Sequence, residues 1–374
     1  MPGVYVHIPL CKTRCAYCDF YSTVGTGLAG RYVDAVVREA ALRIQELHGA
    51  PVTTLYVGGG TPSQLPVELM GRLLAGLRQV FVLDAVEEVT VEVNPDDVNR
   101  DYVAALAGMG VNRVSMGVQS FNDAELRAVG RRHSAGQAID AVAAIRAAGI
   151  ANLSIDLIYG LPGQTLESWQ CSVNQALELR PEHISAYALS YEPGTRLWQQ
   201  RERGEVCETD EETSLSMYTF MTDALRAAGY EHYEISNFAL PGKFSRHNSS
   251  YWNDTPYLGL GASAHSYDGH ARRYNPADMR RYIESIECGE LCCEVEALTW
   301  QERYDETVMV RLRTKQGIDL ETVEMRFGSE AAKHLLREAR PYITAGKLKK
   351  NGSRLSLTAD GVMVSDAIIR DLMW

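Results

Sequence analysis

Short β-rich runs alternate with helical stretches up to about residue 190, and this alternation constrains the fold more than any other feature of the chain. Each of six runs is rich in β-branched and other apolar residues, and each is followed by apolar residues at helical spacing. Parallel strands need crossover connections, usually helices, so the alternation predicts one parallel sheet. Right-handed crossovers in sequence order would roll this sheet into a barrel or partial barrel, an α/β fold with six β–α units. The predicted strands are Val4–Ile8, Thr53–Val57, Glu88–Val93, Asn112–Val118, Leu153–Tyr159 and His183–Leu189.

The pattern changes after about residue 195. A helix from Glu211 to Ala228 and a strand over Tyr230–Ile235 precede a stretch, 236–275, that is rich in Gly, Asn, Ser, Tyr and His and is predicted to be irregular. From Trp300 onward, helical runs and a short β-like segment are typical of a small α+β module with a winged-helix-like shape. We therefore expect three parts, over residues 1–195, 196–299 and 300–374.

Composition narrows the class of protein. Lys and Arg number 37 against 48 Asp and Glu, a formal net charge of −11, which argues against a nucleic-acid-binding protein because those need a positive surface. No run approaches the ~18 apolar residues of a membrane-spanning helix, and the first residues lack the basic and apolar regions of a secretory signal. We expect a cytoplasmic protein whose contact with membranes is at most transient.

Three of the eight cysteines lie within eight residues, in the pattern Cys11-x3-Cys15-x2-Cys18. Three thiolates on one loop can hold three corners of a cubane iron–sulfur cluster, which leaves one iron open to a small molecule. Structural zinc requires four protein ligands, and no fourth Cys or His is nearby. Three unrelated thiols are the alternative. Downstream, acidic neighbours disfavour thiolates at three further cysteines and indicate inert thiols: Cys288, Cys292 and Cys293.

Several chemically capable residues fall at or just past the ends of predicted strands. In a parallel barrel, the active site is built at the carboxyl ends of the strands. Each residue alone could equally cap a helix or form a surface pair, but their shared position predicts one common site. These residues are Cys11, Gly58–Thr61, Glu92, Gln119 and Asp156.

Motifs over most of the chain carry a family resemblance. Together with the cysteine pattern, they resemble the radical S-adenosylmethionine (SAM) proteins of the oxygen-independent coproporphyrinogen III oxidase type, which implies a partial (βα)6 radical SAM barrel. The resemblance also implies that Cys11, Cys15 and Cys18 bind a [4Fe–4S] cluster whose open iron is chelated by the amino and carboxylate groups of SAM. The motifs are Tyr5-Val-His-Ile-Pro9, Gly58-Gly-Gly-Thr-Pro62, Val91-Glu-Val-Asn-Pro95, Gly117-Val-Gln-Ser-Phe121, Gly130-Arg-Arg-His133 and Asp156-Leu-Ile-Tyr-Gly-Leu-Pro-Gly-Gln-Thr165.

The same resemblance implies a SAM site. Backbone groups of a glycine-containing loop would approach the methionine end, since glycine leaves room and exposes its amides. Two carboxylates would accept hydrogen bonds from the ammonium or the ribose, an amide would bond the ribose, and a guanidinium would pair with the carboxylate. A tyrosine would lie beside them. The loop residues are Gly59, Gly60 and Thr61, and the carboxylates are Glu92 and Asp156. The amide is that of Gln119, the guanidinium is that of Arg131, and the tyrosine is Tyr5.

A second motif, His247-Asn-Ser-Ser-Tyr-Trp252, resembles the H-N-x-x-Y-W signature of the haem chaperone (HemW) branch, and Tyr257 to His265 fits the same branch. An imidazole can ligate haem iron, and Tyr and Trp offer flat apolar faces. The resemblance implies haem as cargo, bound with the help of His247 and delivered to apo-haem proteins such as respiratory enzymes. The cluster and SAM would then regulate the protein, including whether it forms a homodimer, rather than run turnover.

The alternative is an enzyme that uses a 5′-deoxyadenosyl radical to decarboxylate the propionates of coproporphyrinogen III. Two features oppose it. Phe20 occupies the position where the oxidases carry a further cysteine, and only ten residues precede Cys11, whereas the oxidases have an amino-terminal extension. Another radical SAM reaction on a tetrapyrrole, such as methyl transfer or ring opening, is a weaker third interpretation.

Overall fold

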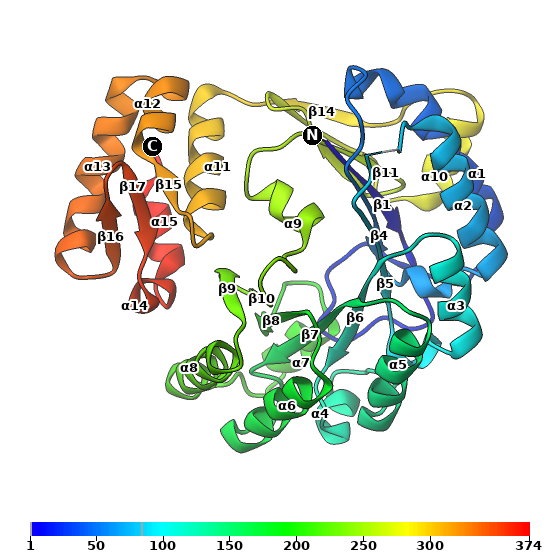
Figure 1. The fold of residues 1–374 in the computed structure, drawn as a ribbon, viewed down its shortest axis with the longest axis horizontal. Helices are drawn as coiled ribbons and strands as arrows, with labels where there is room; N and C mark the ends of the chain where they lie inside the picture. The colour runs from blue at the N-terminus through cyan, green and yellow to red at the C-terminus, as the bar shows by residue number, and fades with distance from the viewer. Residues whose placement is uncertain (1, 84) are drawn as a thin grey trace.

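The computed structural model describes residues 2–83 and 85–374. A strongly curved twelve-stranded sheet forms its centre, and helices cover the outer face of the curve (Figure 1). The six strands at the middle of the sheet are parallel and follow sequence order, which confirms the predicted α/β partial barrel. They are β1 (Gly3–Ile8), β4 (Thr54–Gly59), β5 (Glu88–Val93), β6 (Arg113–Gln119), β7 (Asn152–Tyr159) and β8 (His183–Ala188).

Both edges of this sheet are extended by strands from the later part of the chain. Next to β1 lies β11 (Tyr257–Leu260), which is parallel to it, followed by antiparallel β12 (His265–Tyr267), β13 (Ala271–Tyr274) and β14 (Glu294–Ala297). Next to β8 lie antiparallel β10 (Asn237–Ala239) and β9 (Glu231–Glu234). The prediction of an irregular stretch over 236–275 is therefore wrong. These strands are only three or four residues long, too short for an alternating pattern to stand out among polar residues.

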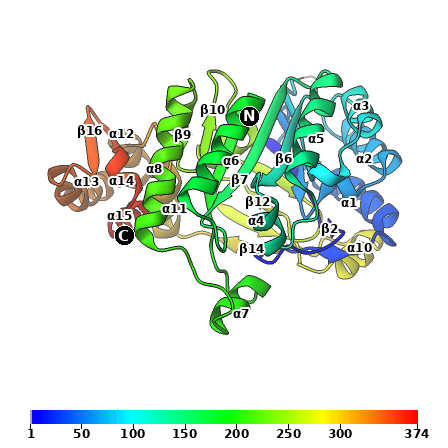
Figure 2. The same cartoon turned by 90° about the horizontal axis from the view of Figure 1, so that it is seen from below.

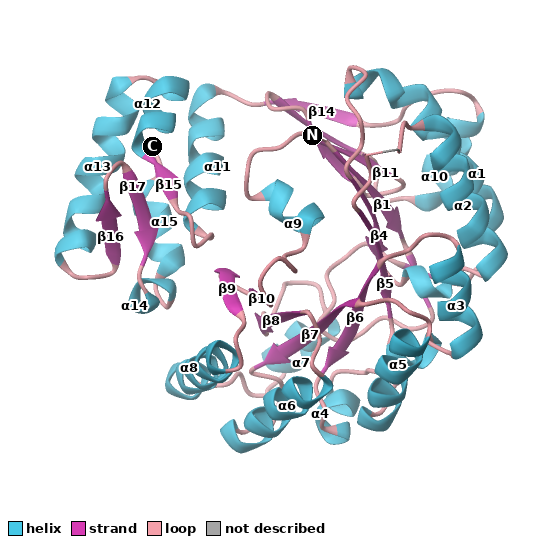
Figure 3. Ribbon diagram, in the orientation of Figure 1, coloured by secondary structure: helices cyan, strands magenta, loops and turns pink. Residues whose placement is uncertain are grey.

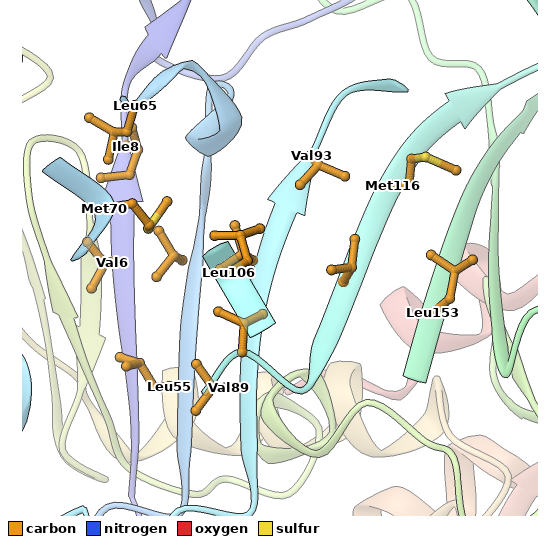
Figure 4. Close-up of a cluster of buried hydrophobic side chains, with 14 of the residues drawn as sticks. Val6, Ile8, Leu55, Leu65, Met70, Val89, Val93, Leu106, Met116 and Leu153 are labelled. Carbon is orange, nitrogen blue, oxygen red and sulfur yellow. The ribbon is translucent and has the colours of Figure 1, made fainter. Parts of the chain in front are cut away.

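The core lies between the outer face of the sheet and the helices. Val6, Ile8, Leu55 and Val89 project from neighbouring strands to this face, and Met70 and Leu106 meet them from helices (Figure 4). Burial of each such side chain contributes about 1.5–3 kcal/mol. Because successive side chains alternate, the remaining positions of β1, Tyr5 and His7, face the inside of the curve. The helices in this part of the chain are α1 (Ala29–Arg43), α2 (Val67–Val80), α3 (Arg100–Gly108), α4 (Asp123–Ala128), α5 (Ala135–Ala147), α6 (Leu166–Leu179), α7 (Arg196–Glu202), α8 (Glu211–Ala227) and α10 (Met279–Glu287).

The carboxy-terminal module has its own core and its own three-stranded antiparallel sheet, in the order β15-β17-β16 (Figure 3). Tyr304, Leu335, Leu355 and Ile369 are among its fully or nearly fully buried side chains. The helices and the β16–β17 hairpin match the predicted α+β, winged-helix-like module. Its elements are α11 (Trp300–Leu312), β15 (Ile318–Asp319), α12 (Leu320–Phe327), α13 (Ser329–Thr344), β16 (Leu348–Asn351), β17 (Arg354–Leu357), α14 (Ala359–Val362) and α15 (Ser365–Leu372).

Two helices depart from the outer layer. The short α9 (Arg246–Tyr251) lies inside the curve of the sheet, between the barrel strands and the carboxy-terminal module (Figure 1). Seen from below, α7 protrudes from the body of the protein (Figure 2). None of the helices in the described ranges is both long and apolar enough to cross a membrane.

Candidate functional site

The three clustered cysteines lie on one loop that follows β1. Cys11 ends the short strand β2 (Leu10–Cys11), which pairs with β3 (Thr23–Val24), and the loop between them carries Cys15 and Cys18. The backbone of Ala16 fixes this loop to the barrel, because its amide donates to the Val129 carbonyl at 2.9 Å and its carbonyl accepts from the Leu197 amide at 2.8 Å. Cys11 is nearly buried, and the other two thiols are half-exposed.

The three thiols do not surround a single point. Among the residues that the structure describes, no three His, Cys, Asp or Glu side chains form a group that one metal ion could occupy. Zinc needs its ligands on one centre, whereas a cubane cluster takes each cysteine at a separate iron. Three cysteine thiols on one loop are a donor set of the kind that holds such a cluster.

Glycines make the room beside these thiols. A Cβ on Gly60 would lie 3.0 Å from Cys11 Sγ and 2.9 Å from the Leu10 carbonyl oxygen. Gly59 has φ +116°, which side-chain-bearing residues rarely adopt, and a Cβ there would lie 2.8 Å from the His7 ring. Thr61 Oγ1 lies 3.4 Å from Cys11 Sγ. The loop after β4 thus forms a close-fitting wall of the cysteine site.

Arg131 brings a positive charge to the same place. Its Nη1 lies 3.6 Å from Cys15 Sγ, and its Nη2 donates to Asn94 Oδ1 at 2.9 Å and to the Gly117 carbonyl. Its Nε is buried and has no hydrogen-bond partner among the described residues. A buried, unpaired guanidinium donor is costly, so this atom is suited to a bound carboxylate.

Gln119 ends β6 beside Arg131. A Cβ on Gly117 would lie 2.9 Å from Gln119 Nε2 and 3.1 Å from Arg131 Nη2, so the two side chains meet over this glycine. The backbone of Gln119 is left-handed, with φ +69°, at a β-bulge that turns its side chain. The structure therefore brings together Gln119, Arg131 and the cysteine loop.

Two carboxyl groups line the inside of the barrel. Glu92 accepts from the Tyr56 hydroxyl at 2.7 Å and from the Gly59 amide at 3.0 Å. Asp156 accepts from Ser115 Oγ at 3.3 Å. Burial raises the pKa of Glu92 to about 7, with the nearby Asp156 charge adding to the shift, and burial also raises the pKa of Asp156. Glu92 therefore changes its protonation state close to neutral pH.

Tyr5 shares a cavity of about 380 Å³ with Glu92 and Asp156. Its hydroxyl forms a hydrogen bond of 3.0 Å with His7 Nδ1. The cavity is also lined from the carboxy-terminal module by Arg313 and from the far wall by Tyr187. It is large enough for a small polar ligand and offers both acceptors and aromatic faces.

His247 lies at the other end of the strands from the cysteines. Its ring is fully buried, stacks on Tyr56 at 5.0 Å, and has both nitrogens in hydrogen bonds of 2.9 Å, Nδ1 with the Thr54 hydroxyl and Nε2 with the Tyr251 hydroxyl. Burial lowers its pKa to about 3, so the ring is neutral. Thr54 begins β4, so the structure does not bring His247 to the cysteine site, and neither ring nitrogen is open to a ligand.

The carboxy-terminal module holds the segment that follows His247. Arg311 donates to the Asn253 carboxamide oxygen at 2.9 Å and to its carbonyl at 3.1 Å, and Arg326 pairs with Asp254 at 2.6 Å. Arg313 lies over the Trp252 ring, 5.5 Å from its centre. The sequence does not predict these contacts, because arginines on an amphipathic helix give no sign of a partner more than fifty residues away.

His7 and Tyr56 are two further site residues that were not predicted from the sequence. His7 forms a hydrogen bond with Tyr5, and Tyr56 donates one to Glu92. A signal was available. Both residues interrupt the apolar runs of β1 and β4 at positions that alternate with core valines and leucines, which predicts that they face the inside of the barrel.

Comparison with known proteins agrees with this architecture. Residues 5–174 match the radical SAM superfamily, and residues 298–364 match the HemN C-terminal domain. The solved structure of coproporphyrinogen III oxidase (HemN) from Escherichia coli superposes with a TM-score of 0.86 at 26% identity, covering 100% of this chain and 90% of that one.

Relatives named heme chaperone HemW align over nearly their whole length. The protein from Lactococcus lactis is 34% identical over 99% of this chain and 97% of its own. Those from Mycobacterium tuberculosis and Bacillus subtilis are 36% and 32% identical, over 94% and 98% of their own lengths. The chain therefore belongs to the heme chaperone HemW family, built on the radical SAM scaffold.

Proposed function

We propose that this chain binds haem and hands it, chemically unchanged, to haem-free acceptor proteins such as respiratory enzymes. The observation that carries the proposal is the similarity to heme chaperones over 99% of the chain. The net charge of −11 supports a protein that does not bind nucleic acid. We propose the cytoplasm as its compartment and at most transient contact with membranes.

We further propose that Cys11, Cys15 and Cys18 hold a [4Fe–4S] cluster. The lack of a side chain at Gly60, beside Cys11, supports this, as does the Arg131 guanidinium near Cys15, because its positive charge would offset the negative charge of a cysteine-bound cluster. When bound, the cluster supplies an iron with a coordination position open to SAM.

For SAM, we propose a site that runs from the cysteine loop into the cavity. The unpaired Nε of Arg131 would bind the carboxylate, and Glu92 and Asp156 would accept hydrogen bonds from the ammonium or the ribose hydroxyls. The Gln119 side chain adds an amide donor. Gly59 and Gly60 let the backbone approach closely, while their own amides donate to Glu92 and to the Ile8 carbonyl. The proposed residues are Tyr5, Gly59, Gly60, Thr61, Glu92, Gln119, Arg131 and Asp156.

His247 enters this proposal as a positioning residue. Ligation of iron by its ring would break a hydrogen bond to Thr54 or to Tyr251 inside the barrel. Its contacts instead support a role in holding α9 and the aromatic wall of the lumen. We propose that residues 1–195 carry the cofactors, 196–299 shape the haem site, and 300–374 fix that region in place.

Anaerobic titration of haemin into the cluster-reconstituted protein, followed by desalting, tests haem binding. We expect a Soret band that survives desalting at about one haem per chain. Loss of the haem from the wild-type protein on desalting would refute the proposal.

Coproporphyrinogen III oxidation is the second candidate, favoured by the TM-score of 0.86 with HemN. Phe20 opposes it, because this side chain is 63% exposed where the oxidases are expected to carry a cysteine. Incubation with coproporphyrinogen III, SAM and a reductant should leave all four propionates intact. Formation of vinyl groups would establish the oxidase instead.

A further inference from the structure

The nine histidines differ in whether a ring nitrogen is open to a ligand. Six are buried or half-buried and take part in hydrogen bonds through their rings: His7, His133, His183, His232, His247 and His334. The other three, His48, His265 and His270, are exposed. Because a histidine ligand needs a ring nitrogen whose lone pair can reach the haem iron, these three are the candidate ligands.

Two of the exposed histidines are poorly placed. His48 follows the short helix η1 (Ile44–Leu47), which continues α1 on the outer layer of the barrel. His270 lies in the turn between β12 and β13, and its Nδ1 is 3.2 Å from Arg303 Nη1. His265 begins β12, and the described residues provide no hydrogen bond to its ring nitrogens.

Strand alternation places His265 on the inner face of the sheet. Its neighbour Ser266 is buried toward the helices, where Oγ accepts from Arg43 of α1 at 3.0 Å. Tyr267, two residues after His265, pairs in register with Tyr257, and the ring of Tyr257 contacts Tyr251 of α9 inside the curve. His265 and Tyr267 share one face of β12, so the His265 ring is on the lumen side.

His265 also lies near the cysteine loop. It is close enough to His7 to contribute to the lowered pKa of that residue. His7 Nε2 is hydrogen bonded to the Tyr21 carbonyl on the cysteine loop, and the Tyr21 hydroxyl accepts from the Met279 amide beyond β13 at 2.8 Å. The same loop exposes Phe20 and Val24, which are 63% and 72% exposed.

The surroundings of His265 suit a flat, metal-bearing ring. The Tyr274 ring stacks on the imidazole at 5.6 Å with an interplanar angle of 28°, which fixes its orientation. Partial burial and the nearby Arg272 lower the pKa of His265, so the ring is neutral at pH 7 and keeps a lone pair.

We propose that His265, which Tyr274 of β13 orients on the inner face of the sheet, is the axial ligand to the iron of bound haem. This inference rests on the proposed function, since it requires that the chain binds haem. It assigns the ligand to the segment after the H-N-x-x-Y-W motif and leaves His247 a positioning role.

The test compares haemin binding by the full-length, cluster-reconstituted wild type with three variants: His265→Ala, His265→Met and His270→Ala. The His270 variant is the matched control, because it removes an exposed imidazole five residues away. We expect about tenfold or greater weakening for His265→Ala and wild-type binding for His270→Ala. His265→Met should retain haem with a Soret position and an electron paramagnetic resonance spectrum changed to those of thioether ligation.

Wild-type affinity and spectrum in His265→Ala would overturn the assignment while leaving haem binding intact. So would an unchanged spectrum in His265→Met, because a merely structural residue does not set the ligand signature. If the wild type itself fails to retain haem, the proposed function falls and this inference with it. Circular dichroism of each variant checks the fold, which an exposed side chain should not disturb.

Discussion

Gly60 lies against Cys11 so closely that a methyl group has no place. A Cβ would approach Cys11 Sγ to 3.0 Å and two backbone oxygens, those of Leu10 and Ile8, to 2.9 and 3.1 Å. Backbone atoms cannot swing aside as a flexible side chain can, so the loop or the thiol must shift. We predict that Gly60→Ala reduces cluster content several-fold after reconstitution, measured as iron and sulfide per chain and as visible absorption.

The control for this prediction is Gly136→Ala. Gly136 lies in the first turn of α5, and its added Cβ would meet only Ser134 Oγ, at 3.8 Å. Alanine is the better helix former by up to about 1 kcal/mol, so this variant should fold and load the cluster as the wild type does. Equal cluster content in both variants would contradict the close fit at Gly60.

Glu92 makes the stability of the cofactor-free protein depend on pH. Its pKa is raised to about 7 when folded, above its ordinary value of 4.5, so the folded state binds its proton more tightly. The stabilisation this gives is present below pH 4.5 and is lost as the pH rises through about 7. Glu92→Gln removes this titration. We predict that, between pH 5 and pH 8, the unfolding free energy of the variant gains about 2–3 kcal/mol relative to the wild type.

Urea unfolding of both proteins at the two pH values measures this difference. All other titrating groups are shared, so the comparison isolates Glu92 and any coupling to Asp156. An equal change with pH in the two proteins would mean that Glu92 is not desolvated inside the barrel.

One carboxylate takes part in two ion pairs between the carboxy-terminal module and the loop after α9. Asp254 pairs with Arg326 at 2.6 Å and with Arg311 at 3.5 Å, and its backbone is left-handed, with φ +53°. Asn tolerates this conformation and removes the charge. We predict that Asp254→Asn weakens the contact by about 1 kcal/mol, seen as faster proteolysis before α11 and a change in Trp252 fluorescence.

Glu330→Gln is the matched control for Asp254→Asn. Glu330 pairs with Lys333 within one exposed helix of the same module, so its loss should change neither readout. The same proteolysis rate in Asp254→Asn as in the wild type would mean that these ion pairs do not hold the module in place.

Strands and helices long enough to show a repeating apolar pattern could be predicted from the sequence, and the short strands at the edges of the sheet could not. Glu88–Val93 matches the structure at both ends, and the helix predicted over Glu211–Ala228 begins at Glu211 and ends one residue earlier, at Ala227. The parallel strand β11 was missed, because Tyr257–Leu260 is four residues long and lies among glycines. Its pairing with β1 depends on contacts made more than 250 residues apart, which no local pattern encodes.

The residues of the candidate site also divide into those whose position the sequence predicted and those whose position it did not. The strand-end position of Cys11, Gly59, Glu92 and Asp156 followed from the β–α alternation, since the carboxyl ends of parallel strands share one edge. The burial of His247 did not, because this residue lies on α9 and its ring packs against β4, and α9 was hidden in the stretch expected to be irregular. A motif identifies such a residue but does not say whether its ring nitrogens are open.

Taken as a whole, the molecule is a partial barrel with a carboxy-terminal module that lies beside α9, on the inner side of the curved sheet (Figure 1). A chaperone needs to release its cargo as well as hold it. The measurement that tests this account most directly is transfer of haem from the loaded, desalted protein to a haem-free acceptor such as apomyoglobin. We predict a fall in the donor Soret band matched by the acceptor spectrum, with the porphyrin unchanged by mass. Haem that stays bound to this chain, or that is recovered chemically altered, would contradict a delivery role.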